Sequence, residues 1–258
     1  MTYSVQLYSV REALEADFDG TIRRLAEIGY RRVEPCAFET RVEAFSAAFA
    51  EHDITAPTGH TFLIPTGEMA PDLDQVFTAA RRLGIGTVVH PVVPPERWQD
   101  IEAVRDTAAQ LNAAAKKGAE YGLRVGYHNH DWEIASKIKD TTALEALVSL
   151  LDPDVVLEVD TYWAAVGGED PARLLQQLGE RVVAIHIKDG PATKDTAAQL
   201  PAGQGRMDVW GIIEAAPHLE VGIVEFDDYA GDIFEGVTSS LRYLEAGPGA
   251  GRVKGGAR

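Results

Sequence analysis

The segment VVLEVDTYWAAVGGEDPARLLQQLGERVVAIHIKDG, residues 155–190, holds two short apolar runs on either side of an amphipathic stretch. The runs, residues 155–161 and 182–188, are rich in Val and Ile, which is typical of strands buried in a parallel sheet. Between them, Asp170 offers an N-cap and Pro171 a first-turn proline, so a helix is predicted to begin there. The segment therefore predicts one strand–helix–strand unit.

The same alternation runs through the whole chain. Asp17 is the predicted N-cap of the first long helix and Gly29 its end, while Gly84 and Gly122 end two later helices, the second predicted from about Glu96. Eight units in 258 residues average about 32 residues, close to the ~30 of one unit and the ~250 of a (β/α)8 barrel. The predicted strands are residues 3–9, 32–37, 55–62, 87–92, 124–130, 155–161, 182–188 and 222–227.

We therefore expect the α/β class and a (β/α)8 TIM barrel. A doubly wound open sheet would carry a glycine-rich phosphate turn after its first strand, and SVREAL stands there instead. The barrel is expected to form a single domain over residues 1–246. The end of the chain, GPGAGRVKGGAR at residues 247–258, is rich in glycine and is expected to be a flexible tail outside the barrel.

Composition excludes several classes of partner. The chain has 24 Lys and Arg against 40 Asp and Glu, a formal net charge of −16, so neither nucleic acid nor an anionic membrane is an expected partner. Cys36 is the single cysteine, which rules out an intrachain disulfide and fits a reducing, cytoplasmic location. We expect no signal peptide, because no basic region precedes an apolar run at the start, and no membrane span.

Polar residues gather where five of the predicted strands end. The motifs are GHTF, YHNHDWE, EVDTYW, HIKDG and VEFDD. Active sites of (β/α)8 barrels lie at the carboxyl ends of the strands, so these side chains are the candidates for chemistry. A divalent cation takes carboxylate oxygens and imidazole nitrogens as ligands. Four successive strand ends supply such a set, namely Glu133, Asp160, His186 and Glu225.

These motifs resemble those of the xylose isomerase-like barrels, also called the sugar phosphate isomerase/epimerase family. The resemblance rests on VQLYSVRE, YHNHDWE, LEVDTYWA, AIHIKDG, GQGRMDVWGII and IVEFDD, in that order along the chain. It implies one divalent metal ion, manganese first and magnesium, cobalt or zinc as alternatives. The family's Glu, Asp, His, Glu ligand set maps onto Glu133, Asp160, His186 and Glu225. Many members place the first glutamate within the fifth strand, so His128 is the alternative first ligand.

The resemblance also implies a reaction on a small-molecule sugar. The expected activity is a metal-dependent isomerase or epimerase that removes the proton next to the carbonyl of a keto-sugar. Glu225 or His130 takes that proton, and the other group or Lys188 returns it. The HNH motif resembles proteins that process 3-keto-glycosides, so a lyase that eliminates the aglycone is the alternative. The family is also compatible with a homo-oligomer or a partner subunit.

Other side chains are expected around the substrate. Trp132 and Trp163 offer flat faces for a sugar ring, and Gln6, His60 and His128 offer hydrogen bonds. Arg206, in the GQGR loop, could meet an anion together with backbone amides. These substrate-binding candidates are Gln6, His60, His128, Trp132, Trp163 and Arg206.

Each candidate also has a structural interpretation. The two histidines of the HNH motif could be core histidines that hydrogen-bond a backbone carbonyl, and Lys188 could form an ion pair with Asp189. Glu158 alternates with Asp160 on one strand face, so it either contacts substrate or supports a ligand from one layer deeper. Among other functions, an endonuclease on abasic DNA is opposed by the charge, and a non-catalytic sugar-binding protein would need no metal ligands.

Overall fold

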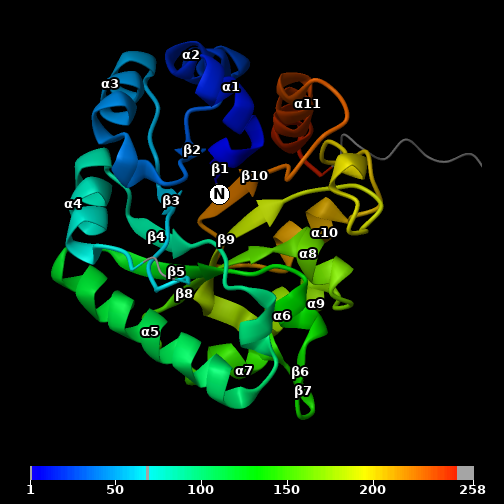
Figure 1. Ribbon diagram of the computed structural model, residues 1–258. Helices are drawn as coiled ribbons and strands as arrows, with labels where there is room; N and C mark the ends of the chain where they lie inside the picture. The colour runs from blue at the N-terminus through cyan, green and yellow to red at the C-terminus, as the bar shows by residue number, and fades with distance from the viewer. Residues whose placement is uncertain (1, 68–69, 249–258) are drawn as a thin grey trace, which may run out of the picture.

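The computed structural model describes residues 2–67 and 70–248, which form a barrel of parallel strands ringed by helices (Figure 1). Eight strands pair in the order β2-β1-β10-β9-β8-β5-β4-β3. Parallel bridges from Arg32 to Thr55 and from Cys36 to His60 join the two edge strands and close the barrel. The strands are β1 (Thr2–Gln6), β2 (Val33–Glu34), β3 (Thr58–His60), β4 (Thr87–His90), β5 (Arg124–His128), β8 (Val156–Asp160), β9 (Val182–Ile187) and β10 (Val221–Val224).

Helices cover the outer face of the barrel, and short 3-10 turns occupy several loops (Figure 1). None of the helices in the described residues combines the length and apolar character that a membrane span requires. The α-helices are α1 (Arg11–Ala16), α2 (Phe18–Ile28), α3 (Val42–His52), α4 (Leu73–Leu83), α5 (Ile101–Glu120), α6 (Trp132–Ala135), α7 (Ala143–Leu150), α8 (Thr161–Val166), α9 (Pro171–Leu178), α10 (Val209–Glu214) and α11 (Ile233–Ala246). The 3-10 helices are η1 (Leu7–Val10), η2 (Phe38–Thr40), η3 (Pro95–Trp98), η4 (Gly179–Arg181) and η5 (Thr196–Ala198).

The predicted (β/α)8 barrel is confirmed, and each predicted run overlaps one strand. The strands stop earlier than predicted at their carboxyl ends. In β1 the cause is local: the Gln6 side chain accepts a hydrogen bond from the Tyr8 amide and caps η1. Asp17 caps α2, which Gly29 ends at a φ of 124°. Helix α5 begins at Ile101 rather than near Glu96, because Asp100 caps it and the preceding η3 is a separate turn.

Two further segments are the hairpin after β5 and the end of the last helix. A short antiparallel hairpin, β6 (Lys137–Ile138) with β7 (Thr141–Thr142), follows β5 and was not expected. Helix α11 ends at Ala246, where Gly247 has a φ of 80°. Residues 249–258 of the predicted tail lie outside the described residues, so the division into domain and tail stays a prediction.

The register of the sheet gathers polar side chains inside the carboxyl end of the barrel. Asp160 in β8 pairs with His186 in β9, and His128 in β5 pairs with Glu158 in β8. Where the segments of β2 and β3 meet and close the barrel, a parallel β-bridge joins His60 to Cys36. Because every second residue of a strand faces inward, ionisable groups from distant segments meet in a buried space.

Candidate functional site

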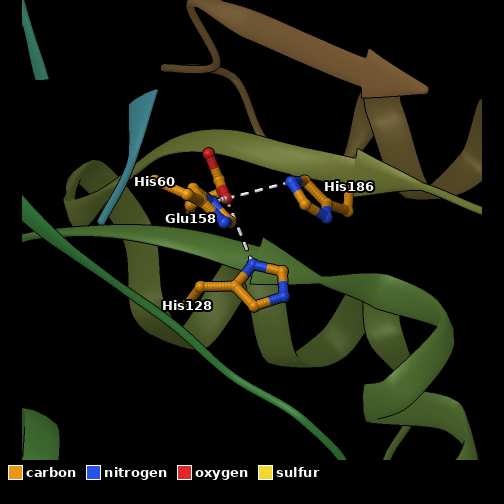
Figure 2. A group of neighbouring side chains, drawn as sticks. All are labelled: His60, His128, Glu158 and His186. Carbon is orange, nitrogen blue, oxygen red and sulfur yellow. Dashed lines mark hydrogen bonds and ion pairs between the residues drawn. The ribbon is translucent and has the colours of Figure 1, made fainter. Parts of the chain in front are cut away.

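Glu158 lies at the centre of three histidines (Figure 2). Its Oε1 atom is 2.5 Å from His60 Nε2, 3.1 Å from His128 Nδ1 and 3.0 Å from His186 Nε2. All four side chains are buried, with at most 6% of any residue exposed. The histidines come from β3, β5 and β9, so this contact joins three strands that are far apart in sequence. Glu158 therefore orients three imidazole rings at once.

Glu34, at the end of β2, contacts two of the same rings, those of His186 and His60. Its Oε1 atom lies 2.9 Å from His186 Nε2 and 3.3 Å from His60 Nε2, and it accepts a 2.6 Å hydrogen bond from the Gln6 amide. Glu34 is fully buried. Burial and the nearby negative charge of Glu158 raise the pKa of Glu34. The pKa of Glu158 is instead held well below its usual range: burial alone would raise it, but His60, His186 and His128 outweigh burial.

A second cluster, formed by Asp160, His186 and Glu225, lies beyond the first. Its ligand atoms all lie within 4.8 Å of one another. His186 Nδ1 is 3.9 Å from Asp160 Oδ2 and 3.6 Å from Glu225 Oε2, and His128 Nε2 is 3.8 Å from Asp160 Oδ2. All three atoms are buried. Within the described residues, His186 Nδ1 has no hydrogen-bond partner, and Asp160 Oδ2 and Glu225 Oε2 face the Lys188 ammonium. A buried imidazole nitrogen without a partner is costly, and its position between two carboxylate oxygens points to a bound cation.

This donor set fits a divalent cation. Bonds of roughly 2.0–2.2 Å would place neighbouring ligand atoms about 3.0–3.5 Å apart, a few tenths of an ångström closer than the separations between these atoms. The rings of His128 and His186 each turn one nitrogen to Glu158, so their other nitrogens face Asp160. A carboxylate behind a histidine ligand fixes the tautomer and the orientation of the ring. A buried His, Asp and Glu cluster that could hold a metal ion is thus present, with Glu158 as its support.

Binding of a divalent cation at this site is coupled to the loss of a proton from His186. Burial would lower the pKa of His186, but the charges of Glu158 and Glu34 raise it to about 10. A cation can bind Nδ1 only after that nitrogen has lost its proton. Burial also lowers the pKa of His128 well below its usual value, so this ring is neutral and its free nitrogen is ready to act as a ligand.

The structure corrects the expected position of Glu133. This residue lies in α6, apart from Asp160, His186 and Glu225, and both of its carboxylate oxygens are engaged elsewhere. Tyr127 Oη donates to Oε1 at 2.5 Å, and the His130 amide donates to Oε2 at 2.9 Å. The loop after β5 turns into α6, and this turn carries Glu133 away from the cluster. His128 takes the position nearest to the cluster instead.

Glu133 gives a prediction about stability. Burial raises its pKa to about 8, from 4.5. Between these two pH values the folded protein holds a proton that the unfolded chain releases, so rising pH favours unfolding. We expect the free energy of unfolding of the native protein to lose up to about 5 kcal/mol from this group between pH 4.5 and 8.

Glu133→Gln is expected to lack this loss, because glutamine carries no proton to release. Denaturant unfolding at several pH values measures it, and Glu51→Gln, at an exposed glutamate of α3, is the matched control. Equal slopes of stability against pH in the native protein and in Glu133→Gln would contradict the prediction.

His130 lies beside His128, with the ring centres 5.3 Å apart, and its ring stacks on Trp132 with the ring centres 4.5 Å apart. Burial lowers its pKa to about 3, so the imidazole is neutral. Its Nδ1 atom has no hydrogen-bond partner within the described residues. Trp132 donates to the Val93 carbonyl at 3.1 Å, and Trp163 lies with its ring 5.5 Å from the Lys188 ammonium. Neither tryptophan lines the cavity described below, so the expected sugar-stacking role finds no support in their placement.

Arg206 also departs from its expected place. It is exposed and lies outside the cavity, and its backbone amide donates to the Gly190 carbonyl at 3.1 Å. The backbone amides proposed for an anion are already occupied by a carboxylate of the chain itself. Asp189 accepts hydrogen bonds of 2.7 to 3.0 Å from the amides of Gly190, Gly203, Gly205 and Met207. A Cβ at Gly205 would lie 2.1 Å from Asp189 Oδ1, so the loop needs glycine there.

A cavity of about 570 Å³ opens beside the two clusters. Its polar lining contains Asp227 and seven of the candidate residues, namely Gln6, His60, His128, His130, His186, Lys188 and Glu225. One wall is apolar and is formed by Tyr8, Phe62, Pro91 and Val92. Tyr8 is 46% exposed, and the Arg11 guanidinium lies 4.2 Å from the centre of its ring. The cavity therefore combines a charged end with an apolar side.

Three residues of the site escaped the sequence analysis. Asp227 contacts Lys188 and follows Glu225 by two positions, so the alternation of a strand could have revealed it. Tyr8 lies in the turn after β1, a place typical of ligand contacts in barrels. Gln199 sits in a long loop and carries no local signal.

Comparison with known proteins identifies the family. Residues 22–228 match the profile of the family described as "Xylose isomerase-like TIM barrel". The chain belongs to this family. The resemblance expected from the strand-end motifs is thereby confirmed, and the family includes sugar-modifying isomerases, epimerases and dehydratases.

Individual relatives and solved structures share at most about a third of their residues with this chain. An inosose dehydratase from Clostridium tetani is 30% identical over 100 residues, which are 38% of this chain and 30% of that protein. The match thus spans less than a third of that relative. A sugar phosphate isomerase/epimerase structure from Parabacteroides distasonis has a TM-score of 0.80 at 23% identity and covers 95% of this chain and 94% of its own. The structure of the IOLI protein with a bound zinc atom has a TM-score of 0.69 at 15% identity, covering 95% and 97%.

Proposed function

We propose that this protein is a divalent-metal-dependent enzyme that removes the proton next to the carbonyl of a keto-sugar. The observation that carries the proposal is the convergence of three buried ligand atoms, Asp160 Oδ2, His186 Nδ1 and Glu225 Oε2, at the charged end of the cavity. A divalent ion held there, with His128 as a further ligand, would polarise the substrate carbonyl and stabilise the negative charge that develops on its oxygen. The zinc atom in the IOLI structure is in keeping with such a site, and manganese, magnesium and cobalt are alternatives.

His130 is the base that the geometry favours. It lines the cavity, its imidazole is neutral, and it is not among the residues that could hold the cation. Glu225, the other candidate base, has its Oε2 atom paired with the Lys188 ammonium and belongs to the cluster that could hold the cation. Burial makes this imidazole a weak base, but the nearby carboxylate of Asp227 raises its pKa and would stabilise the imidazolium that forms when it takes the proton.

Lys188 keeps its charge and acts as a hydrogen-bond donor. Burial would lower its pKa, but the carboxylates of Asp160 and Asp227 outweigh burial and raise it. An ammonium that holds its proton this firmly is a poor acid. Its role in the reaction is to orient the substrate and to stabilise negative charge on oxygen.

The arrangement of bases favours elimination over epimerisation. Epimerisation needs a second base on the opposite face of the substrate, and a pair of carboxylates is one way to provide it. Here His128 stands where many members of the family have their first glutamate ligand. Glu133 is hydrogen-bonded to Tyr127 outside the cavity. A single base can take the proton while the C–H electron pair forms a C=C bond and the neighbouring C–O bond breaks. His130 can then give the proton to the departing oxygen. The dehydratase activity named for the C. tetani relative belongs to this reaction class.

The apolar wall favours a substrate that carries a leaving group larger than water. The side chains of Phe62, Pro91 and Val92 offer no hydrogen bonds to a hydroxyl-covered ring, and together with the aromatic ring of Tyr8 they suit the aglycone of a 3-keto-glycoside. Loss of the aglycone from such a substrate yields an enone and a free alcohol or phenol. A 3-keto-glycoside lyase is therefore the reaction that we favour.

Isomerisation of a keto-sugar is the second candidate, and the single base is the observation that favours it. His130 can return the proton to the former carbonyl carbon instead of a departing oxygen, while the hydroxyl proton of the neighbouring carbon passes to the former carbonyl oxygen. In that case no bond to a substituent breaks, and a ketose and an aldose interconvert.

The test uses the full chain loaded with Mn²⁺, Co²⁺ or Zn²⁺ and a 3-keto-glucoside of a chromogenic phenol. We expect release of the phenol, and exchange of the carbon-bound proton when the reaction runs in heavy water. Interconversion of ketoses and aldoses without release would favour the isomerase. Neither release nor exchange with any of the three metals, on the glycoside, an inosose or free ketoses, would overturn the proposal.

A further inference from the structure

The ammonium group of Lys188 lies against the same oxygens that a metal ion would use. Its Nζ atom is 2.8 Å from Asp160 Oδ2, contacts Glu225 Oε2 and is 2.7 Å from Asp227 Oδ2. The first two of these atoms belong to the candidate ligand cluster. The lysine is 3% exposed, so water cannot screen its charge. A lysine cation therefore sits where the proposed function places a divalent cation.

The Lys188 ammonium and a divalent cation cannot both bind the oxygens of Asp160 and Glu225 with full affinity. In a buried site the repulsion between an ammonium and a divalent ion a few ångströms apart is large. Binding of the ion therefore requires the lysine to give up Asp160 and Glu225. Asp227 is the remaining carboxylate in contact with Lys188, and it is not one of the candidate ligands.

Asp227 is held in place by Gln199. The Gln199 side-chain amide donates to Asp227 Oδ2 at 2.7 Å, and the Asp227 backbone amide donates to Gln199 Oε1 at 2.9 Å. Gln199 is 1% exposed, and both the nitrogen and the oxygen of its side-chain amide hydrogen-bond to Asp227. Its backbone packs on Gly190, which has a φ of 142° and where a Cβ would lie 3.1 Å from Gln199 Cα. The position of Asp227 is thus set by a loop far from it in sequence.

We propose that Lys188 and a divalent cation compete for Asp160 and Glu225, and that Asp227, positioned by Gln199, retains Lys188 when the cation binds. This inference rests on the proposed metal site. It assigns Gln199 as a positioning residue that acts on metal affinity through Asp227 and Lys188, although it contacts no candidate ligand in the described residues.

The neutral side chain of Gln199 makes the proposal testable. Removing Asp227 would weaken cation binding through loss of negative charge alone, whatever Lys188 does. Gln199→Met changes no charge and keeps an unbranched side chain of similar length, so it removes only the two hydrogen bonds to Asp227. The comparison of each change with and without Lys188 separates the two effects.

The experiment is a titration of the full chain with Co²⁺, followed by its absorption spectrum and by competition with a chelator. Gln199→Met is expected to lower Co²⁺ affinity about tenfold, as the loss of an outer-shell contact does, with the spectrum of the bound ion unchanged. Lys188→Met is expected to raise affinity at least about tenfold. In the Lys188→Met background, Gln199→Met is expected to have no effect.

Two further variants guard the comparison. Lys188→Gln replaces Lys188→Met if the latter does not fold. Asp227→Asn, tested with and without Lys188, gives a second route to the same comparison.

The outcomes separate this inference from the proposed function. Equal losses of affinity from Gln199→Met with and without Lys188 would overturn the competition, as would an unchanged affinity in Lys188→Met. Normal Co²⁺ binding by the native protein together with an unaffected Gln199→Met would overturn the inference alone. No Co²⁺ binding by the native protein would overturn both the metal site and the competition.

Discussion

Asp160→Asn is expected to lower the affinity for a divalent cation by more than about 100-fold and to abolish activity. Loss of an outer-shell contact typically costs 10–100-fold in metal affinity, and Asp160 offers its Oδ2 atom directly. Asparagine suits this position because Asp160 Oδ1 also caps α8 by accepting a 2.8 Å hydrogen bond from the Trp163 amide. An asparagine oxygen can keep that cap, so the fold should survive while the anionic ligand is lost. Elemental analysis after dialysis and competition with a chelator measure the effect.

Asp170→Asn is the matched control for this change. Asp170 caps α9 in the same way, by accepting a 2.9 Å hydrogen bond from the Arg173 amide, but it is exposed and outside the cavity. We expect it to leave metal content and activity unchanged. His186→Ala should lose the metal as Asp160→Asn does. If both site variants retain about one metal ion per chain with native affinity, the cation binds elsewhere and the proposed chemistry fails.

His130→Phe is expected to lower kcat by 10²–10⁴-fold, the usual contribution of a general base, while metal content stays unchanged. Phenylalanine can keep the stacking on Trp132 but has no nitrogen to accept a proton. Exchange of the substrate proton with heavy water should fall in parallel, because this exchange reports the same proton transfer. Steady-state rates and exchange measured by NMR on the metal-loaded protein test both effects.

His218→Phe provides the control for His130, because His218 is an exposed histidine that does not line the cavity. It should leave kcat and exchange unchanged. A His130→Phe variant that retains full exchange would assign the base to another group, and Glu225 would be the next candidate. A variant that loses its metal would show that His130 supports the ligands rather than the substrate.

Much of the fold follows from local patterns in the sequence. The alternation of apolar runs with amphipathic stretches predicted all eight strands of the barrel, because burial on both faces demands near-continuous apolar runs. Caps such as Asp17 and Asp170 placed helix starts, since a capping side chain acts within three residues of itself. The position of Asp160 and His186 at strand ends was also readable, because adjacent strands of a parallel barrel end at the same rim.

What escaped prediction depends on contacts between distant segments. Glu133 lies five residues past His128, and no local pattern reveals that Tyr127 and the His130 amide hold it away from the cluster. The amides of Gly203 and Gly205 look free for an anion until Asp189 is seen to occupy them.

The sequence by itself therefore determined the barrel, the rim that carries the chemistry and the residue types gathered there. Only the tertiary structure decided which of those residues face one another. It put Glu158 behind His128 and His186, and it linked Lys188 through Asp227 to Gln199. The physical reason is range: strand alternation and helix caps act over a few residues, whereas the direction of a buried polar side chain is set by whichever partner the folded chain brings within hydrogen-bond reach.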